Sequence, residues 1–166
     1  MPGVTGYVMT VRFLKTAHPL RCVVTAWAHD RRPFPVSGMG ATERIPHDLA
    51  TFVIERHLAL AGGFFNLTAH HATFRSSGRR PTRPGRAVIA ANRIELDDAE
   101  RAVHLHEDAW RSGSATPVAA ALTEAEQRWW RLEPGDHIEL AWQRLPLPAR
   151  VPRRRPRGAF RRRAPG

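Results

Sequence analysis

The sequence predicts an α+β fold in which helices cover a small antiparallel sheet. Three observations predict it: two alternating segments near the N-terminus, helical spacing through the middle of the chain, and one more alternating segment at residues 138–142. A chain of 166 residues is of the size of one domain. The last strand must join the first two, because two strands alone are only marginally stable in water.

The first strand is expected at residues 7–15, where Tyr7, Met9, Val11 and Phe13 fall on one side. The second is expected at residues 20–28, which are rich in Val, Thr and Trp. Only four residues separate the two, which favours an antiparallel hairpin. Residues 30–43 contain several Pro and Gly and are typical of a loop.

The first helix is expected to open at Pro46 and Asp48, because proline suits the first helical turn and a carboxylate faces the positive end of the helix dipole. Gly62 and Gly63 are expected to end it. Residues 64–74 are apolar enough for a second short helix or a packed turn, and residues 76–85 are typical of a loop. Residues 86–110 form the longest helical candidate.

Thr123 and Glu126 have the spacing of a capping box, which predicts a helix from there through Trp130. Ile138, Leu140 and Trp142 then alternate in the last strand. We therefore expect a single α+β domain over residues 1–145, followed by an Arg- and Pro-rich tail over residues 146–166.

The net charge of +11 is unevenly distributed along the sequence. Residues 150–166 contain no acid and eight arginines: Arg150, Arg153, Arg154, Arg155, Arg157, Arg161, Arg162 and Arg163. The other 149 residues carry 18 basic and 15 acidic side chains, a net charge of only +3. The sequence therefore predicts that the positive charge belongs to a tail and not to a folded face, and that the tail is disordered.

An arginine-rich disordered segment binds nucleic acid or another polyanion without sequence preference and with a steep dependence on salt. This is the first functional hypothesis: a binding protein without catalytic activity, whose eight tail arginines contact the polyanion. The alternative is that arginine simply accumulates in a chain with 25 Arg and one Lys.

Composition excludes several other classes. Cys22 is the only cysteine, which excludes a disulfide framework and a cysteine-rich zinc module. No apolar run approaches the roughly 18 residues of a membrane span. Glycine motifs that cradle phosphates and the Gly-x-Ser-x-Gly nucleophile motif are both absent. These features predict a cytoplasmic protein with no cofactor and no membrane partner.

Nine histidines are unusual for this length and suggest a second hypothesis, a metal-dependent hydrolase. His47, Asp48 and Glu55 lie on the first predicted helix and are the candidate catalytic residues. His47 and Glu55 would bind the metal with His70 or His71. A third hypothesis is a protein-interaction module that docks a partner on the edge of the hairpin or on the pair Trp129–Trp130.

Residues 45–58, Ile-Pro-His-Asp-Leu-Ala-Thr-Phe-Val-Ile-Glu-Arg-His-Leu, followed by Gly-Gly-Phe-Phe at 62–65, resemble uncharacterised small bacterial proteins of high-GC genomes that share a Pro-His-Asp-Leu helix opening. The turn and strand at residues 132–142 resemble the same group. In that group a second histidine often follows the first by four positions, whereas this chain has Thr51 there. The resemblance supports the fold, implies no activity, and removes one ligand from a metal site.

Overall fold

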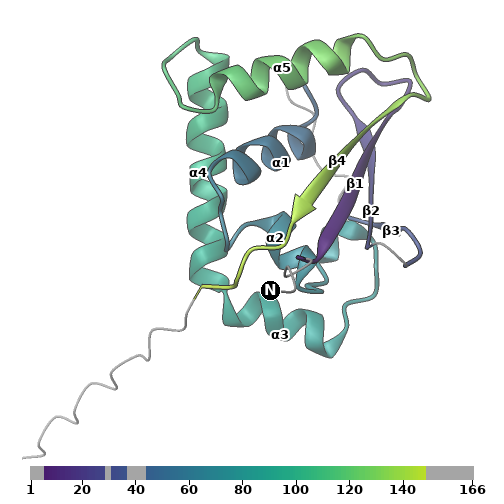
Figure 1. The fold of residues 1–166 in the computed structure, drawn as a ribbon, viewed down its shortest axis with the longest axis vertical. Helices are drawn as coiled ribbons and strands as arrows, with labels where there is room; N and C mark the ends of the chain where they lie inside the picture. The colour runs from purple at the N-terminus through teal and green to yellow at the C-terminus, as the bar shows by residue number, and fades with distance from the viewer. Residues whose placement is uncertain (1–5, 29–30, 37–43, 149–166) are drawn as a thin grey trace, which may run out of the picture.

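The computed structural model describes residues 6–28, 31–36 and 44–148. Within them the predicted α+β fold is confirmed: a four-stranded antiparallel sheet is combined with five α-helices (Figure 1). In chain order the elements are β1 Val8–Lys15, β2 Cys22–Ala28, β3 Phe34–Pro35, α1 His47–His57, α2 Phe64–Ala69, a 3₁₀ turn Arg75–Ser77, α3 Arg83–Ala91, α4 Arg93–Arg111, α5 Ala119–Trp130 and β4 His137–Gln143.

The strand order is β3-β2-β1-β4, so the last strand does return to the hairpin and pairs with β1. The register places Phe13 between Val24 of β2 and Ile138 of β4. These three side chains are buried, because residues directly opposite one another on antiparallel strands share one face, and that face lies against the helices. The short strand β3 lies within the segment expected to be a loop, and it pairs with residues 25 and 26 of β2.

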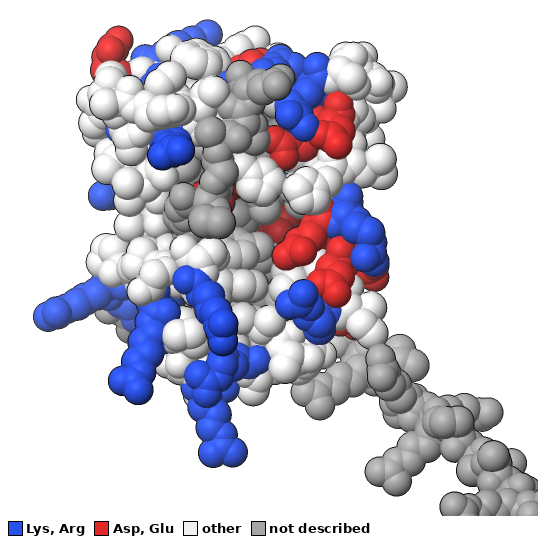
Figure 2. Space-filling view, turned by 180° about the vertical axis from the view of Figure 1, so that it is seen from behind, with Lys and Arg blue, Asp and Glu red and all other residues white. Residues whose placement is uncertain are grey.

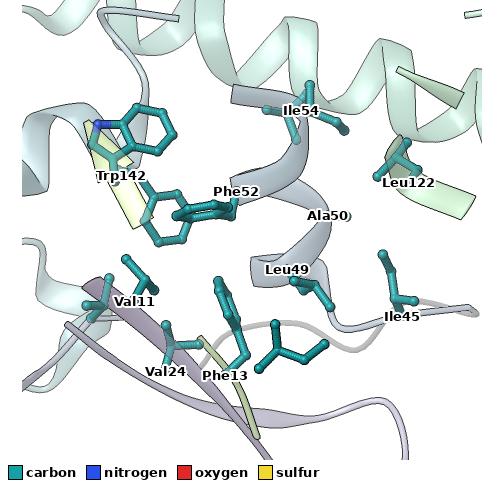
Figure 3. Packing of buried hydrophobic residues seen from close by; sticks show 14 of the residues in the cluster. Val11, Phe13, Val24, Ile45, Leu49, Ala50, Phe52, Ile54, Leu122 and Trp142 are labelled. Carbon is teal, nitrogen blue, oxygen red and sulfur yellow. The ribbon is translucent and has the colours of Figure 1, made fainter. Parts of the chain in front are cut away.

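Helix α1 lies at the centre of the core, with the sheet on one side and α4 and α5 beside it (Figure 1). Leu49, Phe52 and Ile54 of α1 are fully buried, and Phe52 contacts Phe13 and Trp142 edge-on (Figure 3). Burial of this apolar face is the main source of stability in a domain of this size.

The first helix ends earlier than predicted. It stops at His57, and Ala59 takes a left-handed conformation with φ 51°. Gly62 and Gly63 serve close packing instead of helix termination: a Cβ on Gly62 would lie 2.4 Å from Cβ of Glu95, and a Cβ on Gly63 would lie 2.5 Å from Cδ of Glu55.

The single long helix expected over residues 86–110 is two helices, divided at Asn92. The Asn92 side chain donates to the carbonyl of Val88 at 2.8 Å, and its backbone leaves the helical region at φ −121°. Helix α3 also begins inside the predicted loop, since Thr82 caps it by accepting a hydrogen bond from the Gly85 amide at 3.0 Å.

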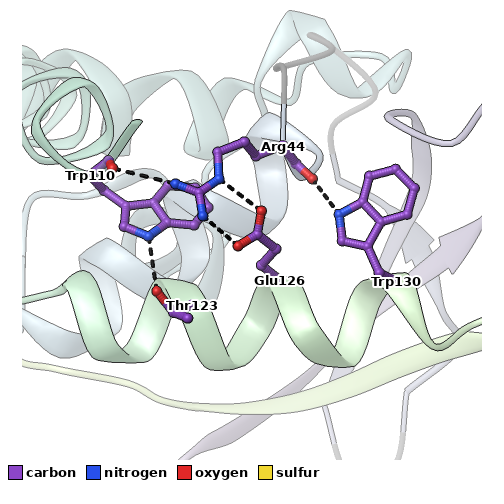
Figure 4. Close-up of polar contacts among 5 residues, drawn as sticks. All are labelled: Arg44, Trp110, Thr123, Glu126 and Trp130. Atoms are coloured by element: carbon purple, nitrogen blue, oxygen red, sulfur yellow. Dashed lines mark hydrogen bonds and ion pairs between the residues drawn. The ribbon is translucent and has the colours of Figure 1, made fainter. Parts of the chain in front are cut away.

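The predicted capping box at Thr123 and Glu126 is wrong, because α5 already begins at Ala119. Both side chains have tertiary partners instead (Figure 4). Thr123 accepts a hydrogen bond from the Trp110 indole at 3.1 Å, and Glu126 holds the Arg44 guanidinium at 2.8 and 2.6 Å. The Arg44 guanidinium in turn stacks 3.8 Å from the centre of the Trp110 ring.

The described chain continues past residue 145 and packs against the domain. The amide of Leu145 donates to Asn66 at 2.8 Å, and Leu147 packs against the buried cluster of Leu67, Ala72 and Leu96. The predicted tail arginines, 150–163, lie outside the described residues. Of the helices that are described, none is both long and apolar enough to cross a lipid bilayer.

Candidate functional site

Helix α1 presents one polar side to a cavity of about 270 Å³. Its partners across the cavity come from α4 and from the start of α2. Three of the lining residues, His47, Asp48 and Glu55, are the candidate catalytic residues predicted from the sequence. The full lining is His47, Asp48, Thr51, Glu55, Phe64, Ser76, Glu100, Val103 and His104. Their approach follows from helical spacing, since residues four apart lie on one side of a helix.

His47 is held between a carboxylate and a hydroxyl group. Its Nδ1 lies 3.1 Å from Oε2 of Glu107, and its Nε2 lies 3.4 Å from the hydroxyl of Thr51. The hydrogen bond with Glu107 raises the pKa of His47, against the opposing effect of burial. The His104 ring stacks on the His47 ring, with 5.8 Å between the ring centres. This arrangement directs Nε2 of His47 toward Thr51, which lines the cavity.

Glu107 is 3% exposed, and its second oxygen, Oε1, is buried without a hydrogen-bond partner among the described residues. A buried carboxylate oxygen in this state is energetically costly. The sequence gives no sign that Glu107 pairs with His47, because the two lie 60 residues apart and no local pattern joins them.

Glu55 has a structural role in the junction between α1 and α2. Its two carboxyl oxygens accept hydrogen bonds from the backbone amides of Phe64 at 2.7 Å and Phe65 at 2.9 Å. The side chain is 2% exposed, and this burial raises its pKa to about 8 despite the two hydrogen bonds. Both oxygens are therefore occupied with the start of α2.

The proposed metal ligands do not converge. Among the described residues, no three His, Cys, Asp or Glu side chains are placed to hold a metal ion. His70 lies 2.8 Å through its Nε2 from the carbonyl of Leu145, and His71 meets the edge of the Tyr7 ring at 6.2 Å. His47 and Glu55 are engaged as described above, so the set His47, Glu55, His70 and His71 is not assembled.

A surface rich in arginine lies at the α3 end of the domain. From residue 56 to residue 94 the sequence contains seven Arg and no Asp or Glu. We call six of them the arginine face: Arg75, Arg79, Arg80, Arg83, Arg86 and Arg93. All are exposed except the half-buried Arg79, whose guanidinium lies 4.4 Å from the centre of the Phe34 ring.

Figure 2 shows Lys and Arg side chains projecting together from the lower part of the molecule, while Asp and Glu gather elsewhere on the same view. The expectation that positive charge belongs to the tail and not to a folded face therefore needs correction. The net charge of +3 over residues 1–149 is a sum over two separated regions and hides this segregation. The spacing of acidic residues along the sequence would have revealed it.

The arginine face surrounds a groove of about 580 Å³ between α3 and the segment that precedes it. Three arginines and an apolar floor line it: Thr73, Phe74, Arg75, Pro81, Arg86, Ile89, Ala90 and Arg93. Arg86 donates to the carbonyl of Pro81 at 3.2 Å, and Arg93 pairs with Asp97 at 3.1 Å. Positive groups above an apolar floor suit an anion that also has an apolar part.

His71, which is next to His70 in the sequence, also has a perturbed pKa. Its pKa is lowered, first by partial desolvation and then by the positive charges of Arg31 and Arg144.

Comparison of the chain with protein-family models, with curated proteins and with solved structures finds no match. The resemblance of residues 45–65 to small proteins of high-GC bacteria stays a prediction. Function is therefore inferred from the charge distribution and the two cavities.

Proposed function

We propose that this protein binds nucleic acid or another polyanion without catalysing a reaction, using its arginine face together with the tail arginines. The observation that carries the proposal is the run of 39 residues, 56–94, which contains seven Arg and no Asp or Glu. Six of these seven arginines make up the arginine face. Binding of this kind depends on the release of counterions from the phosphate backbone.

Two further features support a single polyanion surface. Leu147, near the end of the described chain, packs against the same buried cluster as Val88 and Ile89 of α3. In the sequence, Arg150, the first of the eight tail arginines, follows Leu147 by three residues. We therefore propose that the tail arginines add to the binding of a polyanion at the arginine face.

The test is titration of a duplex of arbitrary sequence at several salt concentrations. Replacing Arg80 and Arg83 with Ala removes two exposed charges from the arginine face. We expect weaker binding and a slope of log Kobs against log salt that falls by roughly 2, about 0.9 for each phosphate that is no longer neutralised. The matched control replaces Arg128 and Arg131, which are exposed at the end of α5. Equal effects of the two pairs would contradict the proposal.

A second candidate function is hydrolysis in the cavity beside α1, and the chain Glu107–His47–Thr51 favours it. Here His47 acts as a general base: its Nε2 takes a proton from the Thr51 hydroxyl or from water, and that oxygen attacks an ester carbonyl. The ester C–O bond then breaks, and the protonated His47 returns the proton to the leaving alkoxide. If Thr51 is the attacking group, water hydrolyses the acyl-Thr51 in a second step of the same kind. Unlike the metal-dependent hydrolase predicted from the sequence, this reaction uses no metal.

Hydrolysis of p-nitrophenyl acetate by the purified protein tests the second candidate. Activity should rise with pH through the raised pKa of His47, be lost in His47→Gln, and persist in the presence of a chelator. Activity that is unchanged in His47→Gln, or no activity above that of the buffer, would remove this candidate.

A further inference from the structure

We propose that the groove beside α3 holds one unpaired nucleotide of a single-stranded nucleic acid, with its phosphate at the arginine rim and its base on the apolar floor. This inference rests on the proposed function and specifies the partner more closely. It names a site that neither the tail nor the arginine face implies alone.

Charge complementarity selects an anion as the occupant. Arg75 and Arg86 are exposed at the groove, and no described carboxylate lies within 3.5 Å of their guanidinium groups in a hydrogen bond. Arg86 is oriented by its hydrogen bond to the Pro81 carbonyl, which leaves its remaining donors for a ligand. An arginine fork of this kind binds phosphate oxygens in pairs.

The floor of the groove selects a nucleotide that is not paired. Phe74 and Ile89 line it, and both are only half-buried in the free protein. The Phe74 ring is supported from behind by Phe64, at 4.4 Å between ring centres. Binding proteins for single strands combine a positive groove with an aromatic platform of this kind, because every base has an apolar face to offer.

A duplex uses the same surface less completely. Its bases are stacked inside the helix, so a duplex can reach the arginine rim and leave the floor exposed to water. The volume of about 580 Å³ also falls in the range of sites that enclose a small organic group. The groove thus adds a contribution from the base to the electrostatic attraction of the whole surface.

The experiment uses the full chain and two fluorescent probes of equal length and charge: a 20-residue oligothymidylate and an abasic 20-mer that keeps the phosphates without the bases. We expect the oligothymidylate to bind about tenfold more tightly. Ala90 is exposed at the groove, and Ala90→Glu places a negative charge there. This variant should bring the two affinities within threefold of each other.

The matched control is Ala120→Glu, which makes the same charge change at an exposed position of α5 and should keep the tenfold preference. Circular dichroism of both variants checks that they fold. If the unaltered protein binds the two probes equally, the groove inference is overturned while the proposed function stands. If it binds neither probe, the proposed function itself fails. Poly-glutamate and the abasic strand are also compared as competitors for bound oligothymidylate. If poly-glutamate displaces oligothymidylate as efficiently as the abasic strand, the groove binds an acidic peptide and the inference is also overturned.

Discussion

Lys15 is the only lysine in a chain with 25 arginines, and the structure explains why an ammonium group stands there. It is 7% exposed, and its Nζ donates to the carbonyls of Trp129 at 3.1 Å and Leu132 at 2.9 Å, at the end of α5. The same nitrogen lies 5.4 and 5.1 Å from the ring centres of Trp129 and Trp130. A compact cation thus satisfies helix-end carbonyls between two indoles.

Replacing Lys15 with Met keeps most of the aliphatic packing and removes both hydrogen bonds. A hydrogen bond from a charged group contributes about 1.5–3 kcal/mol, and burial of the ammonium offsets part of the total for the pair. We therefore expect the free energy of unfolding to fall by about 3 kcal/mol.

Urea unfolding followed by tryptophan fluorescence measures this loss, because Trp129 and Trp130 adjoin the substituted site. The matched control is Arg12→Met on the same strand, which removes an ion pair with Glu139 between two side chains that are 42% and 38% exposed. Pairs of this kind contribute at most about 1 kcal/mol. A loss below about 1 kcal/mol in Lys15→Met, or a loss equal to that of the control, would refute the capping role.

Three other substitutions test the core and its polar contacts. Burial raises the pKa of Glu55 to about 8, so between pH 4.5 and 8 the folded state holds a proton that the unfolded state has released. The free energy of unfolding therefore falls as the pH rises, by up to about 1.4 kcal/mol per pH unit. Glu55→Gln should remove this slope in urea unfolding at about pH 5 to 8, and an unchanged slope would contradict it. Asn66→Leu should lower the free energy of unfolding by about 4 kcal/mol, since it breaks hydrogen bonds with the buried Trp142 indole and with both backbone groups of Leu145. A decrease under about 1 kcal/mol in thermal unfolding would show that these hydrogen bonds are dispensable. Leu122→Ala should cost about 2–5 kcal/mol because the side chain is fully buried, and a neutral result would place it outside the core.

Three of the four described strands were predictable because their signal is local, whereas the two-residue strand β3 lies in a segment predicted to be a loop. Alternation at residues 7–15, 20–28 and 138–142 identifies β1, β2 and β4 within about two residues, and the marginal stability of a lone hairpin requires the last strand to pair with it. The helix ends were less predictable. Asn92 carries no strong breaking signal, and its side chain divides α3 from α4 through a bond to Val88 that a sequence pattern does not encode.

Tertiary partners explain the remaining errors. Thr123 and Glu126 match a capping box, yet Trp110 and Arg44 bind them in the middle of α5. The metal site was an alternative hypothesis, and in the described structure hydrogen bonds direct His47 toward Glu107 and place His70 against Leu145. Helical spacing did predict that His47 and Glu55 lie near one side of α1, and in the structure both line one cavity together with Asp48.

The measurement that tests the central claim most directly is the salt dependence of duplex binding by a full chain in which all eight arginines of residues 150–166 are replaced with Gln. If the folded arginine face binds the duplex, the variant should still bind, and the slope of log Kobs against log salt should stay negative with a smaller magnitude. A variant that no longer binds, or one whose binding does not change with salt, would contradict a role for the folded domain.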